Sequence, residues 1–172
     1  MRALDQEVKD KGLIFLNELG LDPGIDHLAT MKIVHETEKA GGKILEYESW
    51  CGGLPSPDCC DNPIGYKFTW SPIGAFRALN NKAVFINNSK EEIIESKDLQ
   101  YYGAKIELNQ ALTFEGYPNR DSVSYKETYG LKDATKVLRG TLRYQGFCNV
   151  INAWKSLGFM EEREVKSSTW VE

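Results

Sequence analysis

The sequence predicts an α+β domain in which helices cover a mixed β-sheet. Three observations predict this class. Segments of alternating polar and apolar residues, typical of strands, interleave with amphipathic stretches of helical period. Glycine, proline and asparagine residues separate these segments. Their order lacks the regular βαβ rhythm that a parallel sheet requires.

The N-terminal quarter is predicted to hold two helices and a strand. A short helix covers 3–11, and the apolar run 13–18 has the length of a strand. A longer helix begins at "LDPG", with Asp22 as its N-cap and Pro23 at the first helical position, and ends at Gly41. The buried stripe of this helix is expected to be Ile25, Leu28, Met31 and Ile33.

The middle of the chain is predicted to combine strands with one long loop and one short helix. Residues 43–53 alternate as a strand does, whereas 52–65 hold too many Gly, Pro and Asp residues for regular structure. "YKFTWS" (66–71) is predicted to be a strand, and a Ser-Pro pair opens a helix over 71–80. Residues 82–112 are weakly patterned and are expected to form strands around a polar excursion.

The C-terminal third begins with "TFEGYPNRDS" (113–122), where Gly, Pro and Asn in close succession predict a turn. Residues 123–129 fit one or two helical turns. Alternation predicts a strand over 135–147, and an amphipathic helix is predicted over 147–158. The tail, 161–172, is polar until its last tryptophan.

The composition argues against several function classes. A net charge of -4 and a pI near 5.4 do not favour a nucleic-acid-binding surface. No run approaches the ~18 apolar residues of a membrane span, and the charged N-terminus lacks the apolar core of a secretory signal. The four cysteines form no CxxC pair and the chain has two histidines, which favours reduced thiols in a cytosolic protein over a zinc site.

Two polar clusters on predicted regular elements are candidates for a binding site. Asp22 lies where a strand passes into a helix, and the N–H groups of a helix N-terminus suit a bound anion or a capping carboxylate; alternatively Asp22 is only the N-cap. Arg139, Thr141 and Arg143 share one face of a predicted strand, because alternate residues point the same way. Two guanidinium groups on one face suit carboxylate recognition, although an ordinary exposed face has the same pattern.

Two further residues lie at predicted breaks in regular structure. Arg120, on the predicted turn, would lose little conformational entropy on binding a ligand; alternatively it forms an ion pair with Asp121 or Glu115. Cys51 precedes a Gly-Gly pair at the end of a predicted strand. Its thiol is either part of a site or a small buried hydrophobic side chain.

Four motifs, in this order and at these spacings, carry a resemblance to a known family. They are "LNELGLDPGIDH", "CGGLPSPDCCDNPIGYKFTWS", "FEGYPNRDS" and "VLRGTLRYQGF". The sequence closely resembles saccharopine dehydrogenase of the NADP-dependent, L-glutamate-forming type, also called saccharopine reductase. The resemblance extends from about the first residue to Gly158 and is weakest over 80–112.

The resemblance implies part of a larger enzyme. Members of the family begin with a Rossmann domain that carries a glycine-rich dinucleotide loop, and a substrate-binding and dimerisation domain is inserted before the chain returns to it. No G-x-G-x-x-G follows a first strand here, so the Rossmann half is expected to be missing. Residues 1–24 would be the last helix and strand of the nucleotide-binding domain, 25–160 the saccharopine-binding and dimerisation domain, and 161–172 the start of the return.

The resemblance also implies a reaction in lysine metabolism. L-Glutamate and 2-aminoadipate 6-semialdehyde condense to an imine, which NADPH reduces to saccharopine; the physiological direction stays open. The implied setting is a cytoplasmic homodimer, or mitochondria if the segment belongs to a bifunctional degradative enzyme. The alternative is a shortened, non-catalytic module that binds a metabolite or dimerises.

The resemblance assigns roles to individual residues. The implied substrate-binding residues are Asp22, Arg120, Thr141, Leu142 and Arg143. The implied cofactor-binding residues are Leu21, Asp22, Pro23 and Ser71, with NADP as the cofactor. Asp22 and Cys51 would lie near the reacting carbon and are the candidate catalytic residues, and no metal ligand is implied.

Overall fold

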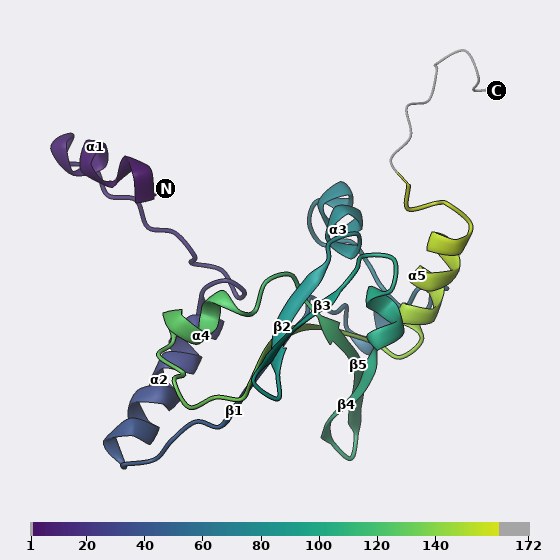
Figure 1. Cartoon of the computed structure of the whole chain (residues 1–172). Coiled ribbons are helices and arrows are strands. Elements are labelled where there is room, and N and C mark those ends of the chain that lie inside the picture. Colours follow the sequence, from purple (N-terminus) through teal and green to yellow (C-terminus); the bar gives the residue numbers. More distant parts are fainter. Residues whose placement is uncertain (1, 162–172) are drawn as a thin grey trace. The chain divides into compact units, whose positions relative to one another are not determined.

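The structure, a computed structural model, describes residues 2–161 of the 172-residue chain (Figure 1). The chain forms two compact units, Met1–Lys43 and Ile44–Glu172. The predicted return segment, 161–172, lies outside the described residues except for Glu161, so it stays a prediction.

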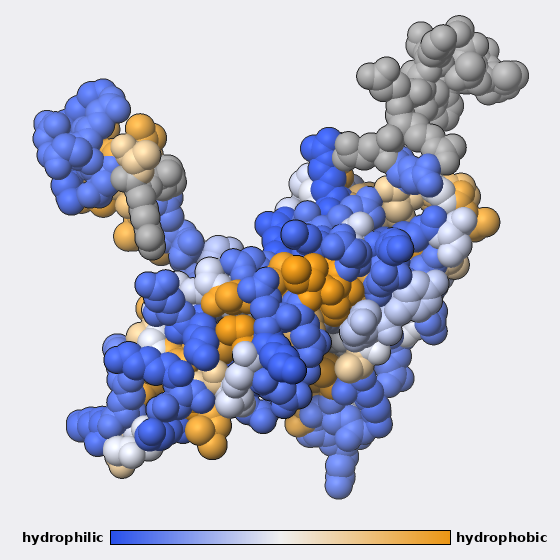
Figure 2. All heavy atoms as spheres, viewed as in Figure 1, coloured by the Kyte–Doolittle hydropathy of each residue, from blue (hydrophilic) through white to orange (hydrophobic). Residues whose placement is uncertain are grey.

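The first unit is helical over the described residues 2–43. Its helices are η1 (Arg2–Leu4), α1 (Asp5–Asp10) and α2 (Ile25–Lys39). The helix predicted over 3–11 is confirmed, but the strand predicted over 13–18 is wrong. A strand needs a neighbouring strand for its backbone N–H and C=O groups, and no strand lies beside this run among the described residues. Its side chains are exposed, Ile14 by 91%, and Figure 2 shows hydrophobic atoms at the surface beside α1.

The start of α2 differs from the prediction, which placed Asp22 at the N-cap and Pro23 at the first helical position. The N-cap is Gly24, and a backbone carbonyl supplies the acceptor that a capping side chain would provide: the Ile25 amide donates to the Gly20 carbonyl at 3.0 Å. Gly24 has a φ of 151°, and a Cβ there would lie 2.1 Å from the Gly20 oxygen. Glycine is therefore required where the motif suggested a carboxylate cap.

The buried stripe predicted for α2 is also wrong. Of its four members, Ile25, Leu28 and Ile33 are 59%, 74% and 61% exposed, and Met31 is half-buried. The buried residues of α2 are Thr30 and Val34. At about 3.6 residues per turn, Ile33 does not fall in line with Ile25 and Leu28, so the predicted residues never formed one face.

The second unit is built on a six-stranded mixed sheet, which confirms the predicted fold class. The strand order is β3-β2-β6-β5-β4, and β1 also pairs with β6. The β1–β6 pair is parallel, and the other strand pairs are antiparallel. The strands are β1 (Glu46–Cys51), β2 (Ala83–Asn87), β3 (Lys90–Ile94), β4 (Ala104–Asn109), β5 (Leu112–Pro118) and β6 (Lys136–Arg143).

The second unit also contains short helices. They are η2 (Pro57–Cys59), α3 (Pro72–Leu79), η3 (Leu99–Tyr102), α4 (Ser124–Thr128) and α5 (Phe147–Ser156). The predicted Ser-Pro opening of α3 is confirmed: Ser71 is the N-cap, its Oγ accepts a hydrogen bond from the Gly74 amide at 3.2 Å, and a proline follows. The hydrophobic core joins α3, η3 and α5 to strands β2, β3, β5 and β6.

Two predictions in the second unit are wrong in part or whole. Residues 66–71 form no strand. The centroids of the Tyr66 and Phe147 rings lie 5.7 Å apart, and the Tyr66 backbone amide donates to Asn62 Oδ1 and not to a neighbouring strand. The turn predicted over 113–122 is shorter, because its first six residues belong to β5. The chain turns at Arg120, which has a φ of 48°.

The Trp50 indole fixes the alignment of β1, β6 and β5. A Cβ on Gly140 would lie 2.1 Å from the indole Cζ3, and one on Gly116 would lie 2.6 Å from the same atom. The two glycines therefore leave room for the ring across two neighbouring strands, and Gly116 is present for packing rather than for a turn.

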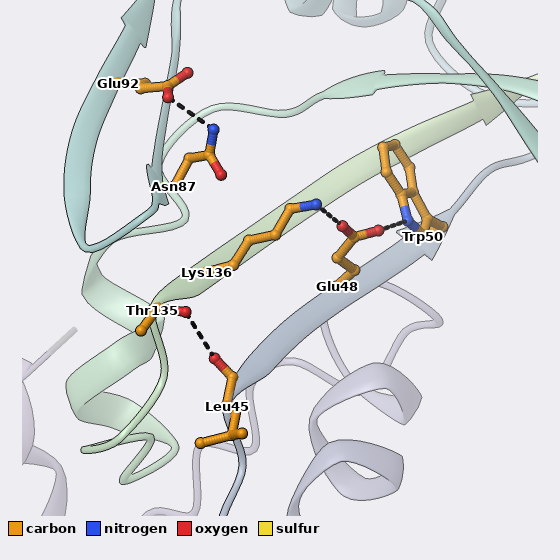
Figure 3. A network of polar contacts seen from close by, with 7 residues as sticks. All are labelled: Leu45, Glu48, Trp50, Asn87, Glu92, Thr135 and Lys136. Carbon is orange, nitrogen blue, oxygen red and sulfur yellow. Dashed lines mark hydrogen bonds and ion pairs between the residues drawn. The ribbon is translucent and has the colours of Figure 1, made fainter.

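A polar network supports the same alignment (Figure 3). The Trp50 indole Nε1 donates to Glu48 Oε2 at 3.0 Å, and Lys136 on β6 forms an ion pair with Glu48. Burial raises the pKa of Glu48, but the hydrogen bonds from Lys136 and Trp50 outweigh it, and the pKa is lowered overall. The Thr135 hydroxyl donates to the Leu45 carbonyl at 3.3 Å, just before the two strands begin to pair.

Candidate functional site

One face of the sheet brings together residues from three strands. Cys51 on β1 and Tyr117 on β5 both pair with Thr141 on β6, from opposite sides. Paired residues point to the same face of a sheet, so the three side chains form a row across it. Arg143 lies two residues beyond Thr141 and shares this face, as the alternation in the sequence predicted.

The Arg143 side chain is held between aromatic rings. Its guanidinium carbon lies 4.9 Å from the Tyr66 ring centroid and 5.3 Å from that of Phe147. One terminal nitrogen donates to the Leu142 carbonyl at 2.7 Å, while Nε is buried with no hydrogen-bond partner among the described residues. Ring contacts of this kind orient a guanidinium without neutralising its charge.

The carboxylate that is paired in register with Arg143 forms a hydrogen bond with another element. Glu115 pairs with Arg143 across β5 and β6, yet its Oε1 accepts a hydrogen bond from the Cys148 amide at 2.5 Å. That amide belongs to the first turn of α5, whose N–H groups need acceptors. Among residues 2–161, no carboxylate forms an ion pair with Arg143, so its charge is available to an anion.

Tyr117 is the most enclosed residue of the row, with 4% of its surface exposed. Burial raises the pKa of its phenol to about 12; the charge of Arg143 and a hydrogen bond with the Thr141 side chain act in the opposite direction. The phenol is therefore neutral at physiological pH and keeps its proton. Cys148, packed nearby, also has its pKa raised to about 12, by burial and by Glu115.

The other arginine on this face has a different setting. The guanidinium carbon of Arg139 lies 4.1 Å from the Tyr125 ring centroid on α4. The Tyr125 ring contacts the Tyr129 ring, and the Tyr129 ring centroid lies 5.5 Å from that of Tyr47 on β1. The backbone amide of Arg139 donates to the Ser122 hydroxyl at 2.8 Å.

Arg120 is exposed, and the ion pairs considered for it do not form among the described residues. Asp121 Oδ1 accepts hydrogen bonds from the Val123 and Ser124 amides, at 2.8 and 3.4 Å, and Glu115 bonds to α5. The Arg120 backbone is fixed by β2, because its carbonyl accepts from the Val84 amide at 2.8 Å. The ion-pair interpretation of Arg120 is therefore wrong.

The remaining predicted site residues fall into two groups. Leu21, Asp22 and Pro23 lie in the exposed turn before α2 in the first unit. Ser71 and Leu142 lie in the second unit, Ser71 as the exposed cap of α3. The Leu142 side chain is buried, 8% exposed, on the sheet face opposite Thr141, so any ligand contact of Leu142 must use its backbone.

Other kinds of site are scarce in the described part of the chain. A depression of about 650 Å³ in the first unit is lined mainly by apolar side chains, such as Leu4, Val8 and Phe15, and by no predicted site residue. Among residues 2–161, no group of three or more His, Cys, Asp and Glu side chains could hold a metal ion. No helix in this range is long and apolar enough to cross a membrane.

The family follows from comparison with known proteins. Residues 20–172 match the family described as Saccharopine dehydrogenase C-terminal domain. The chain belongs to this family. The solved structure of apo saccharopine dehydrogenase (L-Glu forming) from Saccharomyces cerevisiae matches 93% of this chain, over 36% of its own chain, with a TM-score of 0.86 and 43% identity. The resemblance seen in the motifs is confirmed.

Relatives of this chain show how much of a complete relative it represents. It is 45% identical over 164 residues to the Pyricularia oryzae protein named saccharopine dehydrogenase [NADP(+), L-glutamate-forming], covering 36% of that protein. It is 38% identical to the Bos taurus mitochondrial alpha-aminoadipic semialdehyde synthase, covering 17% of it. The chain thus spans about a third, or less, of these relatives.

Three residues that shape this face, Tyr66, Tyr117 and Phe147, were not predicted from the sequence, and Glu115 was predicted only as a possible partner of Arg120. Each acts through a partner that is distant in sequence, so no local spacing marked it. The alternation of 113, 115 and 117 on β5 could have placed Glu115 and Tyr117 on one face, had the segment been recognised as a strand.

Proposed function

We propose that this chain is the saccharopine-binding part of an NADP-dependent, L-glutamate-forming saccharopine dehydrogenase. One observation carries the proposal. Arg143 is held over two rings, beside Thr141 and Cys51, with no carboxylate neutralising it among the described residues. A half-buried guanidinium in this setting gains most from a ligand carboxylate, for which its planar fork is suited.

Saccharopine matches this chemistry because it carries three carboxylates and two nitrogen centres. We assign one carboxylate to Arg143 with Thr141 and another to Arg120, which the turn presents to solvent with its backbone fixed by β2. Asp22 would accept a hydrogen bond from an ammonium group, and Leu142 would contribute its backbone. Charged hydrogen bonds of this kind contribute about 1.5–3 kcal/mol each.

In the proposed reaction, bound NADP supplies the hydride chemistry at a carbon–nitrogen bond of saccharopine. The described residues fit one end of this cofactor only. Strands β2 to β5 lie between the parallel partners β1 and β6 in sequence, so this pair is not the βαβ unit that binds a pyrophosphate. Leu21, Asp22, Pro23 and Ser71 are the proposed contacts; the Ser71 hydroxyl accepts from Gly74 and keeps its own proton to donate.

The chain's own residues would act on the substrate by position. Cys51 pairs with Thr141, so a ligand on Thr141 and Arg143 lies beside the thiol. Cys51 and Asp22 are the proposed groups for proton movement during imine formation or hydrolysis. Orientation of the amine and carbonyl by fixed arginines contributes to the rate independently of either group.

The domain and assembly assignments are part of the proposal. Residues 1–24 would belong to a nucleotide-binding domain, and the exposed apolar side chains of 13–16 and of Leu19 support this, since such side chains are usually covered in a complete domain. L-Glutamate and 2-aminoadipate 6-semialdehyde would be the other ligands. The proposal also includes assembly as a homodimer. The proposed location is the cytoplasm, or mitochondria, as in the name of the Bos taurus relative.

Two measurements test the proposal. Calorimetry should detect saccharopine binding to the full chain or to a chimaera in which the chain replaces its matching segment in the Saccharomyces cerevisiae enzyme. The chimaera should oxidise saccharopine with NADP, and Arg143→Met should abolish this while Arg77→Met on α3 retains it. A folded chimaera that neither binds nor oxidises saccharopine contradicts the proposal.

A further inference from the structure

The long segment 52–65, rich in Gly, Pro and Asp residues, leads to Tyr66, a buried residue that the proposed reaction does not use. The Asn62 side chain closes the turn before it: Asn62 Oδ1 accepts hydrogen bonds from the Ile64 amide at 3.2 Å and from the Tyr66 amide at 3.3 Å. The Gly65 amide donates to the Asn62 carbonyl at 2.9 Å. An asparagine side chain that bonds the following backbone fixes a turn, so the segment places the Tyr66 ring at a defined point.

That point is beside the guanidinium of Arg143. The guanidinium carbon lies 4.9 Å from the Tyr66 ring centroid and 5.3 Å from that of Phe147, within the range in which a ring attracts a cation. The two rings are 5.7 Å apart and their planes are inclined at 66°, so they form two walls of a corner. One terminal nitrogen of Arg143 also donates to the Leu142 carbonyl at 2.7 Å. These contacts restrict the plane of the guanidinium before any ligand binds.

The plane of a guanidinium decides how well it binds a carboxylate. Two parallel N–H···O bonds form only when the fork of the arginine and the carboxylate lie in nearly the same plane. An arginine side chain that must be ordered on binding loses conformational entropy, which weakens the complex. A ring that holds the plane in advance lowers this cost. The ring takes no part in hydride transfer, so its effect falls on carboxylate binding and not on the chemical step.

We propose that Tyr66 is a positioning residue, whose ring, placed by Asn62, holds the Arg143 guanidinium in the plane that a substrate carboxylate requires. This rests on the proposed function. It gives the segment 52–65 a role in substrate binding. The effect belongs to the ring face and not to the phenol hydroxyl, and it requires a planar cation at position 143, without which Tyr66 has nothing to orient.

The test measures KM and kcat of the Saccharomyces cerevisiae chimaera. Tyr66→Leu should raise the KM for saccharopine about two- to ten-fold, the value of one cation–ring contact, with kcat and the KM for NADP unchanged. Tyr66→Phe, which keeps the ring, should restore the KM for saccharopine to within about two-fold of the unsubstituted chimaera. In the Arg143→Lys background, Tyr66→Leu should change kcat/KM less than about two-fold, because an ammonium group has no plane to orient.

The matched control is Phe85→Leu on β2, which removes a ring of the same hydrophobic core that is 6% exposed, against 5% for Tyr66. It should lower stability without raising KM. Asn62→Ala keeps the Tyr66 ring but releases its backbone, so it should also raise the KM for saccharopine, and Asn62→Asp, which keeps an acceptor, should raise it less. This pair tests the inference even if Tyr66→Leu does not fold.

Four outcomes would overturn the inference. They are equal KM values for Tyr66→Leu and Phe85→Leu, a KM raised as much by Tyr66→Phe as by Tyr66→Leu, a loss of kcat alone, and an undiminished effect of Tyr66→Leu in the Arg143→Lys background. In each case the proposed function stands, because the unsubstituted chimaera still oxidises saccharopine. If the unsubstituted chimaera neither binds nor oxidises saccharopine, the proposed function itself fails.

Discussion

Glu115 and Cys148 join the sheet to the last helix: Glu115 Oε1 accepts a hydrogen bond from the Cys148 amide at 2.5 Å. The helix has no side-chain cap of its own, and its N-cap is Gly146 in the left-handed region, with a φ of 95°. A carboxylate from β5 therefore provides the acceptor and the negative charge that a helix N-terminus favours. The same contact engages the carboxylate that is paired in register with Arg143.

Replacing Glu115 tests its capping role. Glu115→Ala should lower the free energy of unfolding by about 1–2 kcal/mol, because an amide of α5 loses its acceptor. Glu115→Gln, which keeps an acceptor, should lower it less. Urea unfolding of the full chain measures both, with Glu91→Ala, an exposed carboxylate on β3, as the control that should change little. Equal stability of Glu115→Ala and Glu91→Ala would contradict the capping role.

Alkaline pH should destabilise the second unit. The pKa of Cys148 is raised from 9.0 to about 12 and that of Tyr117 from 10.0 to about 12, so the unfolded chain ionises before the folded one. The stabilisation from both groups is complete below pH 9.0 and is lost as pH rises toward about 12. Urea unfolding across this window should show a falling free energy of unfolding, with a shallower slope in Cys148→Ala. If the free energy of unfolding falls equally steeply with pH in that variant, Cys148 does not contribute to the alkaline destabilisation.

The contact between Gly140 and Trp50 predicts a strong effect from one methyl group. Gly140→Ala should lower the free energy of unfolding by about 1–3 kcal/mol, because the indole cannot move without breaking the alignment of three strands. Gly53→Ala is the matched control, since a Cβ there meets no atom within 4 Å. Adding Trp50→Leu should recover part of the loss. Similar unfolding midpoints for the two glycine variants would show that the Trp50 indole moves to make room for the methyl group, which would contradict the prediction.

Arg120→Ala tests the exposed arginine of the proposed site. In the Saccharomyces cerevisiae chimaera it should raise the KM for saccharopine about 10- to 100-fold, the value of a charged hydrogen bond, and leave the KM for NADP unchanged. Arg77→Ala, on α3, should change neither constant. Equal increases in both KM values would indicate a structural role for Arg120 instead of contact with a substrate carboxylate.

The sequence identified most elements of the second unit because their patterns are local. Alternation placed 139, 141 and 143 on one face, and the Ser-Pro pair at 71–72 marked the start of α3; both are confirmed. The same local reasoning failed for 13–18 and 66–71. Strand composition alone does not make a strand, because the backbone also needs a partner strand.

Glycines and charged residues were harder to interpret than hydrophobic periodicity. Gly116 was interpreted as part of a turn, yet it lies within a strand. A glycine is needed there because Trp50, 66 positions earlier, occupies the space that a side chain would fill. Glu115 was considered as a partner of Arg120, but it caps a helix. In both cases the deciding neighbour is distant in the chain, so no window of sequence contains the cause.

The sequence by itself determined the family and the α+β class, and it placed Arg139, Thr141 and Arg143 on one strand face, because motif order and side-chain alternation are written along the chain. Only the tertiary structure decided which of these charges are already satisfied. The register of β1, β6 and β5 pairs Tyr117 and Cys51 with Thr141 and commits Glu115 to α5. Whether a charge is free for a ligand depends on distances across strands, which are fixed by packing and not by spacing in sequence.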